Sequence, residues 1–375
     1  MISNPNSFHM FRFSSILRIL LILIACSINA RSAWARVLTG WLEHSAYRID
    51  IPNEQWNGSL IIYCRGLTLE PPKPSELVLN PALSSLLREG FAVAQAGYSS
   101  AGWNVEDGLR DTVALQSYFY SHIAKPKAVY LLGESLGGFI VASLLERATD
   151  SYSGGVALCA PLAPATWFIN GRLLNLRVLF DFYFPKVLPR PDDAAQLPQG
   201  VDIFKTADTL LLANPKAATQ LERYAGMLSV KDLAAAIELY TVVLTDIRSR
   251  VGTTPFDNRN VIYYGFPDAL GVNANISRYI PTLSGLTYFR KNDRLTGALR
   301  EPLIALYPEY DPIVPASISD HYVQMVDDMG TEDLFVRRLE PGEGHCDLSP
   351  SEIVKSFHYL VKWHSTGSKP LPGLR

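Results

Sequence analysis

One serine of this chain lies in a setting where its hydroxyl could attack a carbonyl carbon. Residues 133–138 read Gly-Glu-Ser-Leu-Gly-Gly, so Ser135 is the centre of a G-x-S-x-G motif between a predicted strand and a predicted helix. Such a tight turn leaves no room for side chains two positions away, which explains Gly133 and Gly137. The motif also occurs by chance, as a glycine-rich turn between a strand and a helix whose serine has no catalytic role. Its flanking strand and helix favour Ser135 as a nucleophile.

A serine hydroxyl is a weak nucleophile until a base takes its proton. Of the seven histidines, His345 is the candidate base, because it lies in a loop at 341–346 directly after the last predicted strand. Loops at the carboxyl ends of strands face the ligand crevice in an open α/β sheet. The other histidines fall in the leader, near the N-terminus or in helical patterns. The competing interpretation of His345 is a loop residue that only caps the last helix.

The base should be oriented by a carboxylate that follows the preceding strand. Asp311 is the candidate, with Glu309 as second choice, and Asp320 is less well placed in the next helix. The alternative for Asp311 is turn formation, since Asp-Pro favours turns by itself. These choices give the chain order Ser135, Asp311, His345, with each residue directly after a predicted strand.

A developing oxyanion needs two N–H donors. The residue after the nucleophile, Leu136, should provide one. The loop Arg65-Gly66-Leu67, after the predicted strand at 59–64, should provide the other, and we choose Leu67.

The elements that position these residues alternate along the chain. Apolar runs predict strands at 46–52, 59–64, 91–97, 128–132, 155–160, 303–307 and 334–339, and helical patterns lie at 81–88, 109–123, 136–148 and 351–363. This alternation predicts a mostly parallel sheet flanked by helices. From 162 to 301 the pattern is helical or irregular, and a capping box of Ser229 and Asp232 opens a helix that runs to about Arg250. We therefore expect one α/β core, 36–161 and 302–375, with a helical cap at 162–301.

Residues 1–35 are typical of a secretory signal peptide. Basic residues accompany an apolar run at 16–26, and Ala33-Trp34-Ala35 forms an A-x-A cleavage site. The residues Leu-Ile-Ala-Cys at 23–26 offer an alternative, a lipoprotein signal that ends before Cys26. An uncleaved anchor is a third interpretation, although the run is short for the roughly 20 residues that span a bilayer. We expect a secreted or periplasmic protein that contacts a membrane only through a lipidated or uncleaved N-terminus.

Three cysteines follow the leader, at Cys64, Cys159 and Cys346. Their odd number permits at most one disulfide, so the chain is not a disulfide scaffold. Cys64 and Cys159 lie in apolar strand-like runs, which favours free, buried thiols. Cys346 is next to His345 and receives no assigned role.

Composition excludes some classes of function. The 375 residues carry 34 Lys+Arg against 36 Asp+Glu, and without a basic surplus nucleic acid is not the expected partner. The sequence lacks C-x-x-C, H-x-x-x-H and H-E-x-x-H spacings and a Walker A lysine, and no G-x-G-x-x-G follows a strand. No metal or cofactor is therefore expected.

The motifs resemble those of the α/β-hydrolase superfamily. The residues that carry the resemblance are 133–138, Tyr-Asp-Pro-Ile-Val-Pro at 310–315 and Gly-His-Cys at 344–346. The segments 56–60 and 295–302 and the tail from 344 to 370 are similar to those of secreted members with a helical lid. The resemblance implies the α/β-hydrolase fold and hydrolysis of an ester, thioester or amide. Many members have His-Gly in the oxyanion loop, where this chain has Arg65-Gly66, so Arg65 is free to bind a substrate carboxylate or to pair with Glu134.

Together these residues predict a serine hydrolase that acts through an acyl-enzyme on a small, hydrophobic acyl substrate. The apolar stretch 167–184 either contacts that substrate or forms only the core of the cap. Alternatives with the same three residues are an acyltransferase or a peptidase. From a different class comes a non-catalytic binding protein on the same scaffold, which would not need all three side chains.

Overall fold

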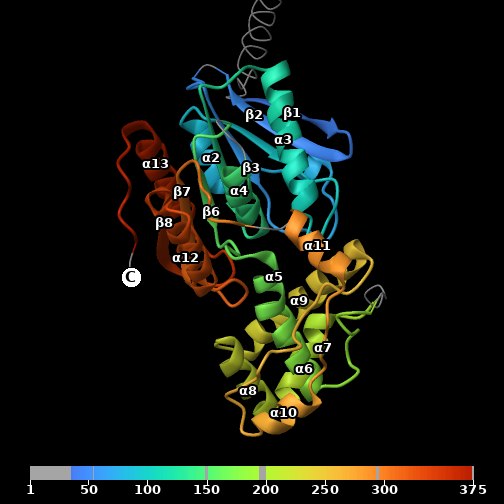
Figure 1. Ribbon diagram of the computed structural model, residues 1–375. Helices are drawn as coiled ribbons and strands as arrows, with labels where there is room; N and C mark the ends of the chain where they lie inside the picture. Colours follow the sequence, from blue (N-terminus) through green and yellow to red (C-terminus); the bar gives the residue numbers. More distant parts are fainter. Residues whose placement is uncertain (1–34, 54, 148–150, 194–199, 293–294, 374–375) are drawn as a thin grey trace, which may run out of the picture.

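The computed structural model describes residues 35–373 except 54, 148–150, 194–199 and 293–294 (Figure 1). The predicted leader up to residue 34, Cys26 included, lies outside the described residues. In the described part, no helix combines the length and the apolar composition that a membrane span requires.

The core is an eight-stranded sheet in the order β1-β2-β4-β3-β5-β6-β7-β8. β2 is antiparallel to β1 and β4, and the other neighbours are parallel. This arrangement confirms the predicted α/β-hydrolase fold. The strands are β1 (Ala35–Leu42), β2 (Ser45–Pro52), β3 (Ser59–Cys64), β4 (Ala92–Ala96), β5 (Ala128–Glu134), β6 (Gly155–Leu158), β7 (Leu303–Tyr310) and β8 (Phe335–Glu343).

The central strands read as continuous apolar runs because helices cover both of their faces. Along β3, Leu60 and Ile62 face one hydrophobic cluster, and Ile61 and Tyr63 face the other. The first cluster includes α3 (Val105–His122), α4 (Leu136–Arg147) and α12 (Asp320–Asp328). The second includes α2 (Pro81–Arg88) and α13 (Pro350–Thr366).

The edge strand β1 was not predicted from the sequence. It pairs with β2 from Ala35↔Pro52 to Leu42↔Ser45. Its residues are exposed or half-buried throughout, so they do not form the apolar run by which a central strand is recognised.

The chain between β6 and β7 contains helices and no strand among its described residues. In Figure 1, α6 to α10 gather below the sheet at one end of the molecule. Ser229 accepts a hydrogen bond from the Asp232 N–H, as the capping box predicts, and opens α9. The elements of this helical segment are α5 (Ala165–Phe168), η2 (Ile169–Leu174), α6 (Asn175–Tyr183), α7 (Ile203–Ala213), α8 (Pro215–Ala225), α9 (Val230–Val251), α10 (Ala269–Asn275) and α11 (Leu283–Asn292).

Short 3-10 helices complete the core: η1 (Pro74–Glu76), η3 (Ala316–Ser319) and η4 (Glu332–Leu334).

Candidate active site

Ser135 occupies the turn between β5 and α4 in a strained backbone conformation. Its φ is 51°, in the left-handed region that residues with a side chain rarely adopt. Its N–H donates to the Leu158 carbonyl of the neighbouring strand at 2.8 Å, and its carbonyl accepts from the Gly138 N–H at 2.9 Å. These bonds hold the turn in place at the carboxyl edge of the sheet. Strain of this kind is often stored at functional sites.

The two glycines of the motif are required by close backbone contacts. A Cβ on Gly133 would lie 2.4 Å from the Gly137 carbonyl oxygen, and a Cβ on Gly137 would lie 2.0 Å from the Cys64 carbonyl oxygen. Both distances are shorter than any real van der Waals contact. Both glycines of the G-x-S-x-G motif are therefore required by the backbone around Ser135.

His345 lies beside Ser135, although 210 positions separate them in the chain. The Nε2 of His345 is 2.9 Å from the Ser135 Oγ, and its side chain is 25% exposed. The loop after β8 is closed tightly, since a Cβ on Gly342 would lie 2.0 Å from the Asp347 carbonyl oxygen. Gly344 has a φ of 139° and donates its N–H to the Tyr310 carbonyl at 2.9 Å. These contacts aim the imidazole at the serine.

Asp311 lies on the other side of the imidazole. Its Oδ2 is 2.8 Å from the His345 Nδ1, and its carboxylate is fully buried. Its Oδ1 accepts from the backbone N–H groups of Ile313 and Val314, both at 2.9 Å. A buried carboxylate is tolerated only when its oxygens are hydrogen-bonded, and these donors also set its orientation.

The other two acidic candidates do not reach the histidine. Asp320 is 63% exposed at the start of α12 and pairs with Arg337. Glu309 is exposed on β7. Among the three carboxylates considered from the sequence, the structure brings only Asp311 to His345.

The predicted oxyanion loop lies against the nucleophile. A Cβ on Gly66 would lie 3.6 Å from the Ser135 Cβ, and Leu67 and Leu136 line the same small cavity as Ser135. Leu136 is the first residue of α4, so its N–H belongs to the first turn, whose N–H groups lack partners inside the helix. Both chosen donors are thus adjacent to the place where a reacting carbonyl would lie.

Arg65 and Glu134 form no ion pair among the described residues. Glu134 instead neighbours Tyr63, where burial first and the carboxylate second raise the pKa of the phenol well above its usual value. No described acceptor reaches the buried Nε of Arg65.

The prediction of a free thiol at Cys159 is wrong. Cys159 forms a disulfide with Cys346, and their Cα atoms lie 5.3 Å apart. Cys159 directly follows β6, and Cys346 directly follows His345 in the loop after β8. The disulfide therefore joins two loops at the same edge of the sheet. The pair lies beside the imidazole, with the Cys346 Sγ 3.8 Å from the His345 Nε2. The apolar context of Cys159 predicted burial correctly, but it carried no signal for pairing.

Cys64 is a free, buried thiol, as predicted. Burial raises its pKa to about 12. In the described part of the chain, one cluster of metal-ligating types comes together, His345 with the two disulfide sulfurs.

A small cavity of about 30 Å³ lies above Ser135. The core contributes Leu67, Trp103, Leu136, Pro161, Ile313 and Val314 to its wall, and the helical segment contributes Phe168, Leu173, Leu239, Tyr240 and Val243. The wall has no charged side chain. Phe168 and Leu173 belong to the apolar stretch 167–184, so part of that stretch faces the site. The remaining wall residues of α9 carried no sequence signal, because they read as an ordinary apolar helix face.

The helical segment is tied to the core beside this cavity. On α9, the Asp246 carboxylate accepts from the Trp103 N–H at 2.7 Å and from the Arg250 Nε at 2.8 Å. Arg250 also donates to the Ala101 carbonyl. The bonds to Trp103 and Ala101 hold α9 against the core on the side of the cavity that Leu239, Tyr240 and Val243 line.

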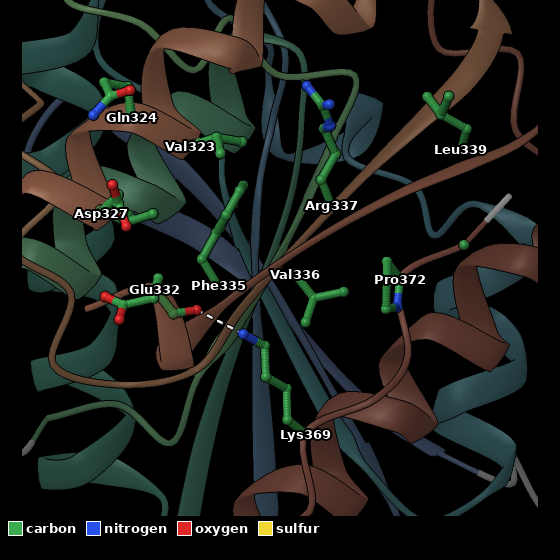
Figure 2. Close-up of a pocket in the computed structure, with 12 residues that line it drawn as sticks. Val323, Gln324, Asp327, Glu332, Phe335, Val336, Arg337, Leu339, Lys369 and Pro372 are labelled. Atoms are coloured by element: carbon green, nitrogen blue, oxygen red, sulfur yellow. Dashed lines mark hydrogen bonds between the residues drawn. The ribbon is translucent and has the colours of Figure 1, made fainter. Parts of the chain in front are cut away.

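A larger cavity lies elsewhere in the described part of the chain. It encloses about 630 Å³ between α12, β8 and the C-terminal tail, and none of Ser135, Asp311 and His345 lines it. Figure 2 shows Val323, Phe335, Val336 and Pro372 around it, with Lys369 donating to the Glu332 carbonyl. Its lining residues include no nucleophile–base pair such as Ser135 with His345.

No protein-family model matches the sequence, and no curated protein matches it. Solved structures similar to the chain include a puromycin-hydrolysing peptidase of Mycobacterium tuberculosis, with 12% identity, a TM-score of 0.46 and coverage of 91% of this chain and 41% of that chain. An esterase of Pyrococcus furiosus has 13% identity, a TM-score of 0.47 and coverage of 88% and 90%. A bacterial membrane phospholipase A has 11% identity, a TM-score of 0.43 and coverage of 94% of both chains. This chain spans less than half the length of the peptidase. The fold is identified by the strand order of the chain itself.

Proposed function

We propose that this protein is a serine hydrolase that cleaves carboxylic esters through an acyl-enzyme. The observation that carries the proposal is the unbroken line of hydrogen bonds from Ser135 through His345 to Asp311, with distances of 2.9 and 2.8 Å. These distances suit proton transfer between a nucleophile and a general base.

The proposed cycle follows from this geometry. His345 takes the proton of the Ser135 hydroxyl through Nε2 while the oxygen attacks the substrate carbonyl carbon. The N–H groups of Leu136 and Leu67 stabilise the oxyanion. Asp311 accepts from Nδ1, holds the imidazole in the required tautomer and stabilises its cationic form. The imidazolium then protonates the leaving alcohol, and water releases the acyl group by the same steps.

The cavity wall supports an apolar acyl group of modest size. Apart from Ser135 and the Tyr240 hydroxyl, its lining side chains are apolar. A volume of about 30 Å³ is far below the roughly 300–1,000 Å³ of ligand pockets. We propose that residues 162–301 act as a cap that opens to admit substrate and returns to its closed position on the core, which excludes water during the reaction.

The test is hydrolysis of p-nitrophenyl esters of increasing acyl length, together with labelling by a fluorophosphonate serine probe. We expect cleavage of short and medium acyl chains, and loss of both cleavage and labelling in Ser135→Ala. A folded wild-type chain that neither cleaves an ester nor reacts with the probe would identify a binding protein and refute the proposal. Addition of an alcohol or amine acceptor separates hydrolase from acyltransferase, and a panel of peptide amides tests the peptidase alternative.

We also propose export, with cleavage after Ala35 or lipidation of Cys26. The disulfide between Cys159 and Cys346 supports this, because such bonds persist mainly in oxidising compartments. Mass spectrometry of the purified chain distinguishes a free N-terminus at residue 36, a lipid on Cys26 and an intact leader.

A further inference from the structure

A single arginine connects the helical segment to the loop that carries Asp311. The Arg172 guanidinium donates to the Pro312 carbonyl at 2.6 Å and to the Ile313 carbonyl at 3.1 Å. Its Nε also donates to the Tyr240 hydroxyl at 2.8 Å. Two of its acceptors are therefore the carbonyls immediately after the acid.

Tyr240 completes the connection from a second helix. Its hydroxyl accepts from Arg172 and donates to the Ile313 carbonyl at 2.9 Å. Tyr240 is 1% exposed, and burial raises the pKa of its hydroxyl, so it keeps the proton that it donates. Arg172 lies in η2, a π-helical turn. Such turns are rare in proteins, and many of those that occur lie at functional sites.

The same loop is held from its opposite side by the acid itself. The N–H groups of Ile313 and Val314 point to the Asp311 Oδ1, whereas the carbonyls of Pro312 and Ile313 point to Arg172 and Tyr240. If the peptide units rotate, both sets of bonds change together. The orientation of the Asp311 carboxylate is thereby coupled to the guanidinium.

A second contact supports the same loop. The Tyr310 hydroxyl donates to the Asp232 carboxylate at 2.9 Å and accepts from the Leu228 N–H at 2.9 Å. The helical segment thus contacts both sides of Asp311 along the chain. Loss of Arg172 would remove the side-chain donor of the buried Pro312 carbonyl and leave the Ile313 carbonyl with the Tyr240 hydroxyl alone. A buried carbonyl without a donor is costly, so we expect the loop to turn.

We propose that Arg172 is a positioning residue: with Tyr240 it fixes the backbone after Asp311, and so holds the carboxylate at the angle from which it orients His345. This role rests on the proposed hydrolase function. It makes the helical segment part of the catalytic apparatus as well as a cover. Arg172 acts through the loop and does not need to touch the substrate.

The test compares Arg172→Met, Arg172→Lys and a control, Arg278→Met, in the full chain. Arg278 is an arginine of the same helical segment that also donates to backbone carbonyls, those of Asn258 and Val261, but it does not contact the acid loop. We expect Arg172→Met to lower kcat about 100-fold, the size of effect that misplacement of a catalytic group by about 1 Å produces. KM should stay within about threefold of wild type, because uniform substrate binding is not removed. Arg172→Lys, which retains part of the hydrogen bonding, should recover part of the lost kcat, and Arg278→Met should turn over like wild type.

The rate of fluorophosphonate labelling gives the same comparison without a chosen substrate. Slow labelling of Arg172→Met beside normal labelling of the control supports the positioning role. Equal labelling of wild type and Arg172→Met overturns that role alone, whereas a wild-type chain that is not labelled overturns the hydrolase function and the role together. A rise in KM with unchanged kcat would identify a substrate-binding arginine and overturn the proposal. If Arg172→Met does not fold, Tyr240→Phe decides, because it removes the hydroxyl that donates to the Ile313 carbonyl and should lower kcat severalfold. An unchanged kcat would overturn the proposal.

Discussion

Removal of the Cys159–Cys346 disulfide is expected to destabilise the folded protein strongly. The bond joins positions 187 residues apart. In the chain-entropy description, a cross-link of that span restricts the unfolded chain by about 5 kcal/mol at 25 °C. Whole proteins are stable by only about 5–15 kcal/mol, so this bond would supply a large share of the stability.

The same change should lower turnover, because the bond lies next to the histidine. Cys346 follows His345 directly, and its N–H approaches the Asp311 Oδ2 at 3.4 Å. Without the cross-link, the loop is attached to the rest of the sheet edge only through weaker contacts. We expect kcat to fall about 10-fold to 100-fold, as for other misplaced catalytic groups, while KM changes little.

The measurement uses the double variant Cys159→Ser, Cys346→Ser. Urea unfolding gives the free energy of unfolding, and hydrolysis of p-nitrophenyl butyrate gives kcat and KM. A dithiol reductant provides the matched control: it should reduce stability and kcat of the wild type toward the values of the variant, and should leave the variant unchanged.

Two results would refute this reasoning. A double variant within about 1 kcal/mol of the wild-type free energy of unfolding would show that the cross-link does not restrict the unfolded chain as described. A variant that loses stability but keeps the wild-type kcat would show that the bond does not position His345.

Three further outcomes follow from local geometry. Gly137→Ala should abolish activity and lower the free energy of unfolding by about 3 kcal/mol or more, because the added Cβ would lie 2.0 Å from the Cys64 carbonyl oxygen. The control is Gly171→Ala, whose added Cβ would have no neighbour closer than 3.7 Å. It should leave activity and thermal unfolding nearly unchanged. Leu239→Ala should shift the preferred p-nitrophenyl ester toward longer acyl chains, since Leu239 lines the cavity. Leu212→Ala, on the exposed face of α7, should not shift it. An unchanged preference in Leu239→Ala would show that α9 does not contact the acyl group. Burial raises the pKa of the Cys64 thiol to about 12, so its reactive thiolate is scarce below that pH. Mass spectrometry should therefore find Cys64 alkylated by iodoacetamide at pH 8 only after the protein is unfolded. Rapid alkylation of the native protein would contradict this burial.

Local sequence determined much of the core. Apolar runs predicted the central strands because each of these strands is buried on both faces, and the Ser229 capping box predicted the start of α9 because a helix start depends on nearby residues. The glycines around Ser135 marked the turn because the close backbone contacts arise within the turn and the adjacent strand. His345 and Asp311 could be chosen because the order of strands places the ends of β7 and β8 at the same sheet edge as Ser135.

Other features were decided only by the tertiary structure. The Cys159–Cys346 bond, the contact of Arg172 with the acid loop and the closing of the cavity by α9 join residues that are distant in the chain and ordinary in their local context. Exposure hid β1 for a related reason, since an edge strand needs no apolar run. Side-chain type and spacing indicate which helix, strand or turn a segment forms by itself. The long-range contacts depend instead on how two folded segments pack against each other.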